Sequence, residues 1–465
     1  MNSATPPASP GTEAVTDQIA RHETAPASST PPGSAEPDAP ETALRVDGLF
    51  KVFGRRADDA VTALREGASR DELGSGTTAA VIDASFEVRR GEIFVVMGLS
   101  GSGKSTLIRM LNGLLEATAG TVTVGDEPIT GIPAKRLRTL RRERISMVFQ
   151  HFALLPHRAV IDNVAYGLEI QGMPKAQRLE RARTTTELVG LGGWEDKLPS
   201  ELSGGMKQRV GLARALAADT EILLMDEAFS ALDPLIRREM QEQLLELQSA
   251  LGKTIVFITH DLNEAMFLGD RIAVMRDGRI VQIGTPEDIL TDPANDYVEQ
   301  FVADVDRARV LTAGSVMEPA TPTVGSGSGP RAALRAMRDA RTAAAFVVDR
   351  DRKLVGTIAD RAALRLLQKG EQRITSAVNP EVASCDTETA LIELFVPAAE
   401  SPLPLAVTDE RERLVGVLPR ITLLAALGGG AMATGEITID QPLPAEVVEE
   451  ALAAPGPARD GEESA

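Results

Sequence analysis

The chain has 465 residues, which is enough for two or three domains that each bury a core of their own. Its 67 acidic and 49 basic side chains give a formal net charge of −18, which disfavours a general nucleic-acid binder because such proteins need a basic surface. The single cysteine excludes an internal disulfide framework. The sequence opens on no secretory pattern, and no apolar run approaches the ~20 residues of a membrane-spanning helix, so we expect a soluble, cytoplasmic protein.

The first part of the chain changes character twice. Residues 1–42 are rich in Pro, Ala, Ser, Thr and Glu and carry almost no large apolar side chain, which predicts a disordered arm. A strand-like alternation runs over 44–54 and resumes over 81–88. The charged, glycine-containing stretch between them, 55–78, is expected to be an inserted loop or a short helix.

The strongest signal follows an apolar run at 93–97 and precedes a helix-like run at 107–111. It consists of Gly98, Leu99, Ser100, Gly101, Ser102, Gly103, Lys104, Ser105 and Thr106. Strand, glycine-rich loop and helix in this order form the context that a phosphate-binding loop requires, with N–H groups and the positive helix end turned to the anion. Lys104 can then reach the β- and γ-phosphates, and the Ser105 hydroxyl can ligate Mg²⁺. The alternative, a glycine-rich turn that caps an ordinary helix, does not account for Lys and Ser in this register.

Further along, apolar runs at 222–225 and 254–258 are continuous, which is typical of parallel strands buried on both faces. Strands that alternate with helices predict an α/β domain, in which residues 152–200 are mostly helical. The first of these runs ends on Asp226 and Glu227. Asp226 is placed to hold Mg²⁺ through water, and Glu227 to act as a base for the attacking water. Acidic pairs at strand ends occur often by chance, but this pair follows a phosphate loop.

A second glycine-rich helix start is formed by Ser203, Gly204 and Gly205, ahead of a helix predicted at 210–217. Its N–H groups can also face an anion. The first loop already binds the β-phosphate of the nucleotide. A second anion-binding helix N-terminus in the same chain is therefore explained if it binds the γ-phosphate of the nucleotide held by another copy. The alternative is a plain serine N-cap followed by glycines.

In their order along the chain, these segments resemble those of ABC-transporter ATPase subunits over roughly residues 44–305. The resemblance also rests on Gln150, on the segment 230–233 and on Thr259-His260. It implies a head-to-tail homodimer that sandwiches two ATP molecules.

The same resemblance implies a role for four further side chains. Gln150 senses Mg²⁺ and the γ-phosphate and relays to a membrane subunit, Asp233 crosses the dimer seam, and His260 bonds the γ-phosphate and orients the attacking water. Phe53 resembles the aromatic residue that stacks on adenine, although the 55–78 insertion stretches the usual spacing and a lone Phe is more often part of a core.

A finer resemblance is to the ATP-binding subunits of bacterial glycine betaine/proline importers, seen in residues 97–106, 147–150, 225–237 and 293–298. It implies ATP and Mg²⁺ as cofactors, a separate membrane permease, an extracytoplasmic solute-binding protein, and a peripheral position on the cytoplasmic side of the inner membrane. An importer for another small solute, such as choline or carnitine, is an alternative. So are a non-transport ABC ATPase and a regulatory protein whose ATP site is only a switch.

After residue 306 two similar passages, 346–358 and 405–418, each contain strand, polar hairpin, strand and then helix, which predicts a paired small α+β module over 311–428. The pair resembles a tandem CBS module, a fold that senses adenine nucleotides or ionic strength. The positions of Ala359 and Ala362 depart from the ribose-binding pattern of that family, so ribose recognition is not implied by them.

A series of basic residues in the first repeat is expected to share helix faces: Arg331, Arg335, Arg338, Arg341, Arg361, Arg365 and Lys369. Such a surface can meet an anionic membrane and be released as salt screens the attraction, which would make an osmosensor; the alternative is a solvated basic face.

Together these interpretations give an α/β chain. A P-loop ABC-type ATPase domain with a mixed sheet, an antiparallel β-subdomain and a helical subdomain at about 151–205 is expected over 43–306. The small α+β tandem CBS domain follows, and then an acidic solvated tail over 435–465.

Overall fold

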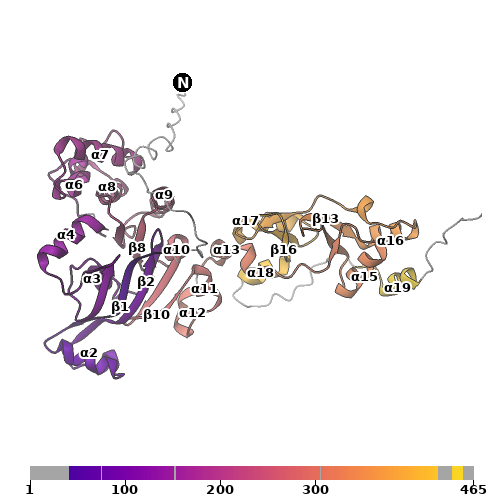
Figure 1. Ribbon diagram of the computed structural model, residues 1–465, viewed down its shortest axis with the longest axis horizontal. Helices are drawn as coiled ribbons and strands as arrows, with labels where there is room; N and C mark the ends of the chain where they lie inside the picture. The colour runs from indigo at the N-terminus through magenta and orange to yellow at the C-terminus, as the bar shows by residue number, and fades with distance from the viewer. Residues whose placement is uncertain (1–40, 75, 151–152, 304, 428–441, 454–465) are drawn as a thin grey trace, which may run out of the picture. The chain divides into compact units, whose positions relative to one another are not determined.

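The computed structural model describes residues 41–74, 76–150, 153–303, 305–427 and 442–453. These residues form two compact units, one that ends at Val302 and one that begins at Ala303 (Figure 1). Most of the arm predicted over 1–42 lies outside the described residues.

The first unit is built on a six-stranded sheet of order β10-β9-β3-β8-β7-β6. Its strands are β3 (Ile93–Met97), β6 (Ile145–Val148), β7 (Ile222–Asp226), β8 (Thr254–Thr259), β9 (Arg271–Arg276) and β10 (Arg279–Gly284). All neighbours are parallel except β9 and β10. Every residue of β3, β7 and β8 is buried, as their continuous apolar runs predict. Because β3, β8 and β7 are parallel neighbours, their carboxyl ends meet at one edge of the sheet.

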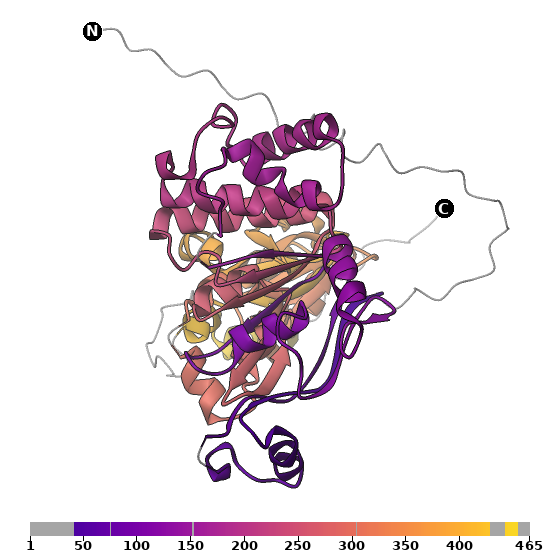
Figure 2. The ribbon, with the colours of Figure 1, turned by 90° about the vertical axis from the view of Figure 1, so that its left-hand side faces the viewer.

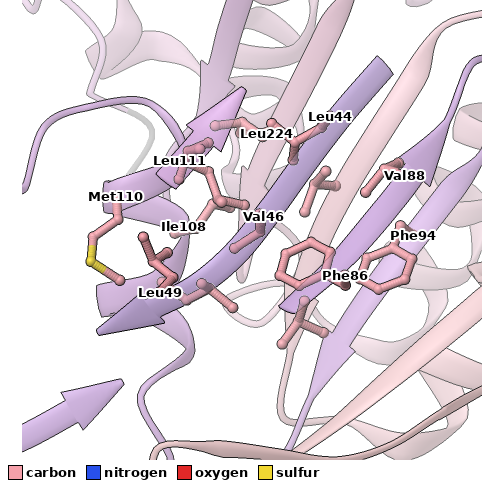
Figure 3. Close-up of a cluster of buried hydrophobic side chains, with 14 of the residues drawn as sticks. Leu44, Val46, Leu49, Phe86, Val88, Phe94, Ile108, Met110, Leu111 and Leu224 are labelled. Carbon is pink, nitrogen blue, oxygen red and sulfur yellow. The ribbon is translucent and has the colours of Figure 1, made fainter. Parts of the chain in front are cut away.

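A second, antiparallel sheet of order β2-β1-β4-β5 faces the first. It consists of β1 (Thr42–Phe53), β2 (Thr78–Arg89), β4 (Ala119–Val124) and β5 (Glu127–Pro128). Helix α3 (Lys104–Leu111) shares one hydrophobic core with both sheets (Figure 3). Within it the rings of Phe86 and Phe94 stack with centroids 5.0 Å apart. This core holds the loop between β3 and α3 at a fixed position.

The insertion between β1 and β2 contains helix α2 (Ala57–Arg65) and a 3₁₀ turn, η2 (Arg70–Glu72). One face of α2 buries Val61 and Leu64 against Phe50 of β1 and Ile82 of β2. In Figure 2 this helix lies beyond the ends of the two strands, at the bottom of the view. The insertion is thus a packed element with its own small core.

Several short helices follow the first sheets and form a separate layer, at the top of Figure 2. Helix α4 (Ala134–Arg144) comes before β6 and buries Leu140 in the core that the two sheets share. The helices of the separate layer are α5 (Val160–Val164), α6 (Tyr166–Ile170), α7 (Lys175–Leu188), η3 (Pro199–Glu201) and α8 (Gly204–Ala217). The fully buried Asn163 fixes the chain that leads into them, because its amide bonds the backbone of Leu155, Arg158 and Ala159.

The rest of the first unit alternates helices with the strands already named. These helices are α9 (Pro234–Leu251), α10 (Leu262–Leu268), α11 (Pro286–Thr291) and α12 (Asp296–Val302).

The second unit contains two three-stranded sheets of the same design. Their strands are β11 (Thr323–Gly325), β12 (Ala344–Val348) and β13 (Leu354–Ala359), and β14 (Ser384–Asp386), β15 (Leu405–Thr408) and β16 (Leu414–Leu418). In each sheet the first pair is parallel and the second antiparallel. The two hairpins meet through reciprocal bonds, from the Leu354 N–H to the Glu412 carbonyl (3.2 Å) and from the Leu414 N–H to the Arg352 carbonyl (3.0 Å). The short strands β11 and β14 were not expected from the sequence.

The helices of the second unit flank these sheets. They are α13 (Arg307–Val310), α14 (Ala313–Val316), α15 (Pro330–Ala340), α16 (Asp360–Gln368), η4 (Thr375–Ala377), α17 (Leu391–Glu400), α18 (Arg420–Leu427) and α19 (Ala445–Ala453).

Helix α19 corrects the prediction of an acidic solvated tail from residue 435. Its Val448 is only 4 % exposed and belongs to the core of the first repeat. The buried Asp360 carboxylate also accepts the Leu443 N–H at 2.8 Å, and Arg331 donates to the Leu452 carbonyl at 3.0 Å. The prediction rested on the acidic composition of this segment, but the few apolar side chains on one face of α19 are enough to pack the helix on the first repeat. Residues 428–441 and 454–465 lie outside the described part.

Across all the described residues, we find no helix that is both long and apolar enough to cross a bilayer.

Candidate active site

The glycine-rich segment 98–103 runs from the end of β3 to the start of α3 and passes close to two other strands. A Cβ atom on Gly98, at φ 150°, would stand 2.1 Å from the Met275 carbonyl of β9, and one on Gly103, at φ 106°, would stand 2.1 Å from the Ala80 carbonyl of β2. Only glycine fits both positions. The loop is thereby wedged between the sheets, with the N-terminus of α3 behind it.

Lys104 begins α3 and is only 4 % exposed. Its Nζ donates to the carbonyls of Gly98 (2.7 Å) and Leu99 (3.1 Å). Burial lowers the pKa of the ammonium group, while the nearby carboxylates of Glu227 and Asp226 oppose that shift. The side chain is held over the loop, where an anion bound to the N–H groups would meet it.

A cavity of about 210 Å³ opens above this loop. It is lined by loop and helix residues and by three residues from other segments: Ser100, Gly101, Gly103, Lys104, Ser105, Thr106, Arg70, Ala80 and Glu227. Ser102 does not line this cavity, and its buried hydroxyl has no hydrogen-bond partner among the described residues. An open cradle of backbone donors and a buried ammonium group fit a phosphate chain. Leu99 is exposed and does not line the cavity.

Asp226 ends β7 directly beside the phosphate loop. The Ser105 hydroxyl donates to its Oδ1 at 3.4 Å. Burial raises the pKa of the Asp226 carboxyl, with Glu227 acting in the same direction and Arg109 against it. A hydroxyl and a carboxylate oxygen at adjacent positions are the hard ligands that Mg²⁺ prefers.

Glu227 follows in the left-handed region, at φ 45°, and its N–H donates to the Ile258 carbonyl at 3.0 Å. Its Oε2 lies 3.2 Å from Gln150 Nε2 and 3.2 Å from His260 Nδ1. Gln150, Glu227 and His260 come after β6, β7 and β8, which are neighbours in the sheet. The structure therefore brings these three predicted residues together at the rim of the phosphate cavity.

A buried network beneath His260 was not found from the sequence. Thr259 Oγ1 bonds Glu264 and accepts the Asp261 N–H at 3.0 Å, while Gln241 donates to Glu264 at 3.1 Å. Burial raises the pKa of Glu264, opposed by those bonds. The signal in the sequence was a lone carboxylate in the apolar run that forms α10. The network fixes the backbone on which His260 stands.

The second glycine-rich helix start departs from the prediction. Helix α8 begins at Gly204 rather than at residue 210, because Ser203 caps it by accepting the Met206 N–H at 3.3 Å. Gly205 packs against Ile236, whose Cγ2 would lie 2.7 Å from a Cβ atom. Asp233 caps α9 by accepting the Ile236 N–H at 3.2 Å. None of the residues that line the phosphate cavity comes from these two helix ends.

Phe53 ends β1 and is 43 % exposed, so it is not part of the core. The Lys51 ammonium lies 5.2 Å from its ring centroid. The ring is not among the residues that line the phosphate cavity. An exposed aromatic face is nevertheless suited to stacking.

Two further residues beside the loop were missed. Arg70, from the insertion, lines the cavity. Tyr297 of α12 lies under the Arg276 guanidinium, 4.3 Å from its ring centroid. Burial raises the pKa of Tyr297, opposed first by Arg276 and then by a hydrogen bond with the Leu99 backbone. Arg70 belongs to no motif, and Tyr297 lies in the segment 293–298, which carries the family resemblance but was given no role in the site. Each reaches the loop from a segment distant in sequence.

Comparisons with known proteins agree with this geometry. A family model described as ABC transporter matches residues 81–230, and one described as CBS domain matches residues 313–369. The glycine betaine transport ATP-binding protein OpuAA of Bacillus subtilis (strain 168) is 49 % identical over 388 residues, which cover 83 % of this chain and 92 % of that protein. The chain belongs to the family of glycine betaine transport ATP-binding proteins.

Two other relatives show the same extent of similarity. The glycine betaine/carnitine transport ATP-binding protein GbuA of Listeria monocytogenes is 48 % identical, over 83 % of this chain and 98 % of that protein. The glycine betaine/proline betaine transport system ATP-binding protein ProV of Escherichia coli (strain K12) is 44 % identical, over 83 % and 97 %. The chain is thus an ABC transporter ATPase followed by a CBS region, as predicted.

Proposed function

We propose that this ABC transporter ATPase hydrolyses ATP to power import of an osmoprotectant of the glycine betaine/proline betaine class through a separate membrane permease. The observation that supports it most is the contact of Glu227 with both Gln150 and His260 at the rim of the phosphate cavity. A site that only binds nucleotide has no need for a carboxylate placed to activate water. The names of the relatives support the substrate class.

In the chemical step each residue has a distinct task. Lys104 and the N–H groups of segment 98–106 bind the phosphates, and Phe53 stacks on the adenine. Ser105, Gln150 and Asp226 would hold Mg²⁺, which supplies neutralisation of the phosphate charge when it is bound. Glu227 takes the proton of the attacking water. His260, fixed by the network beneath it, orients that water and bonds the γ-phosphate.

The working form is a homodimer in which two copies face head to tail. In one copy, Ser203, Gly204 and Asp233 are exposed and do not line the phosphate cavity described above. In a head-to-tail dimer they would close the cavity of the partner copy, with the α8 end against its γ-phosphate.

The remaining partners follow from the substrate class. A membrane permease carries the solute, an extracytoplasmic solute-binding protein delivers it, and this chain docks peripherally on the cytoplasmic side of the inner membrane. Carnitine, which stands in the name of one relative, is a second candidate solute, and choline stays an alternative.

We further propose that the CBS pair regulates transport through the basic face of the first repeat. Arg335, Arg361, Arg365 and Lys369 are exposed there. Attraction of such a face to anionic lipid weakens as salt rises. Substitution of Arg335, Arg361 and Arg365 by Gln should remove the salt activation of uptake, and an unchanged salt response would leave the face as merely solvated.

The deciding experiment compares wild type with Glu227→Gln, with the exposed Glu246→Gln as control. Purified Glu227→Gln should lose hydrolysis by about 10²–10³-fold and still bind ATP. Cells that carry it as their only copy should fail to take up labelled glycine betaine after a salt upshift. Equal uptake by wild type and by a variant that has lost hydrolysis would overturn the substrate assignment, because another carrier would then be responsible for the uptake. Turnover equal to wild type would overturn the role of Glu227.

A further inference from the structure

The insertion between β1 and β2 contributes one side chain to the phosphate cavity. Arg70 is the first residue of η2, and it lines the cavity together with Gly101, Ser105 and Thr106. We propose that Arg70 is an additional nucleotide-binding residue, which contacts the phosphate groups from the insertion between β1 and β2. This inference rests on the proposed ATP site.

The backbone of Arg70 is anchored on both sides. Before it, the Ser69 N–H donates to the Glu72 carboxylate at 2.7 Å, which closes the turn. After it, Leu73 packs against the small core that α2 forms with β1 and β2. The insertion is therefore rigid enough to present a side chain at a fixed place, and the guanidinium group does not depend on a free loop.

The cavity is short of positive charge without Arg70. Its other cation, Lys104, is already bonded to two loop carbonyls, and its pKa is lowered by burial. The Glu227 carboxylate lines the same cavity and repels phosphate. A planar guanidinium can bond two oxygens of one phosphate through two parallel N–H groups, a fixed fork that the compact ammonium group of a lysine does not offer. Arg70 thus offsets a carboxylate that the hydrolysis step requires.

The present partner of Arg70 holds it only weakly. Its Nη1 lies 3.9 Å from Asp277 Oδ1, in the turn between β9 and β10. Asp277 is 71 % exposed at its side chain, and Arg276 Nε competes for its other oxygen at 3.3 Å. Exposed pairs of this kind contribute little. Arg70 is therefore free to exchange Asp277 for a phosphate oxygen.

The test uses the full-length protein and ADP, which is bound without being hydrolysed. Calorimetric titration compares wild type, Arg70→Gln, Arg70→Lys and the control Arg55→Gln, an exposed arginine of the same insertion. We expect Arg70→Gln to weaken ADP binding about tenfold, the energy of one charged hydrogen bond. Arg70→Lys should restore part of this loss, and Arg55→Gln should match wild type.

Adenosine separates a phosphate contact from a structural effect. Adenosine has no phosphate, so its affinity should be equal in wild type and Arg70→Gln. This affinity is measured by displacement of a fluorescent ATP analogue and is corrected for the affinity of each protein for the analogue. ADP affinity within twofold of wild type would overturn the inference, and so would an equal loss for ADP and adenosine. If Arg70→Gln melts early, the same comparison on Arg70→Lys decides. Failure of wild type to bind ADP would instead contradict the proposed function.

Discussion

Two helices of the ATPase unit begin in glycine-rich sequence, and their surroundings are opposite. The start of α3 is wedged between β2 and β9, with a buried lysine, a cavity of about 210 Å³ and two carboxylates around it. The start of α8 is exposed at Ser203 and Gly204, is capped by its own Ser203, and packs Gly205 against Ile236. The first end is a binding site within one chain. The second has the donors but does not line that cavity, so we infer that its function depends on another molecule.

Removal of the Lys104 side chain tests the start of α3, the helix end that forms a binding site within one chain, and it has the largest expected effect on ATP binding. Lys104→Ala deletes the ammonium group and leaves the Gly98 and Leu99 carbonyls without their donor. ATP affinity should fall about 100-fold in calorimetric titration, since charged hydrogen bonds are each worth about 1.5–3 kcal/mol. The exposed Lys135→Ala is the control. Affinity within threefold of wild type would show that the backbone cradle alone binds the nucleotide.

A negative charge at the start of α8 should reduce ATP hydrolysis while it leaves ATP binding almost unchanged. A side chain on Gly204 meets nothing within 4 Å, and an acidic residue in the first turn suits the helix dipole, so Gly204→Asp should melt no earlier than wild type. It would face the partner copy's γ-phosphate and repel it. We expect hydrolysis to fall about tenfold or more, with ATP binding changed less than threefold. Full hydrolysis would remove α8 from the mechanism; Gly204→Ala controls for the lost glycine.

A mixture of the two inactive variants sharpens the comparison further. In a head-to-tail dimer of Lys104→Ala with Gly204→Asp, both lesions fall in one site and the other site is intact. Random pairing should therefore restore up to about a quarter of wild-type hydrolysis, measured as phosphate release. If both helix ends served the same chain, no activity would return on mixing.

The contrast between the two ends also shows what the sequence can predict. The segment 98–106, Asp226-Glu227 and Thr259-His260 were found because each motif is contiguous and follows a buried strand. The start of α8 was placed six residues late, since glycines lower helix propensity, whereas the Ser203 cap decides where the helix begins. Capping outweighed propensity there.

Other features depend on neighbours that the sequence order does not give. Gln150 meets Glu227 because β6 and β7 are adjacent, although 77 residues separate them. Arg70 reaches the cavity from an insertion whose packing rests on a few apolar residues. Likewise the acidic composition after residue 435 hid Val448, which docks α19 on the first repeat. In each case a single tertiary contact overrides the local pattern.

The smallest expected effect concerns the folding stability that the protein loses by burying the Asp226 carboxylate beside the start of α3. The pKa of Asp226 is raised in the folded protein, chiefly by burial, so folding favours the protonated carboxyl and stability is lost as pH rises through that pKa. Asp226→Asn keeps an oxygen that can accept from Ser105 and removes the titration. Without nucleotide it should melt about 2–4 °C higher at pH 8, and the gain should shrink towards pH 4. Thermal melts at both pH values, with the exposed Asp196→Asn as control, measure this. A lower melting temperature of Asp226→Asn at pH 8 would mean that other groups of the chain fully compensate the buried Asp226 charge. Burial of that charge beside the start of α3 would then not lower the stability of the fold.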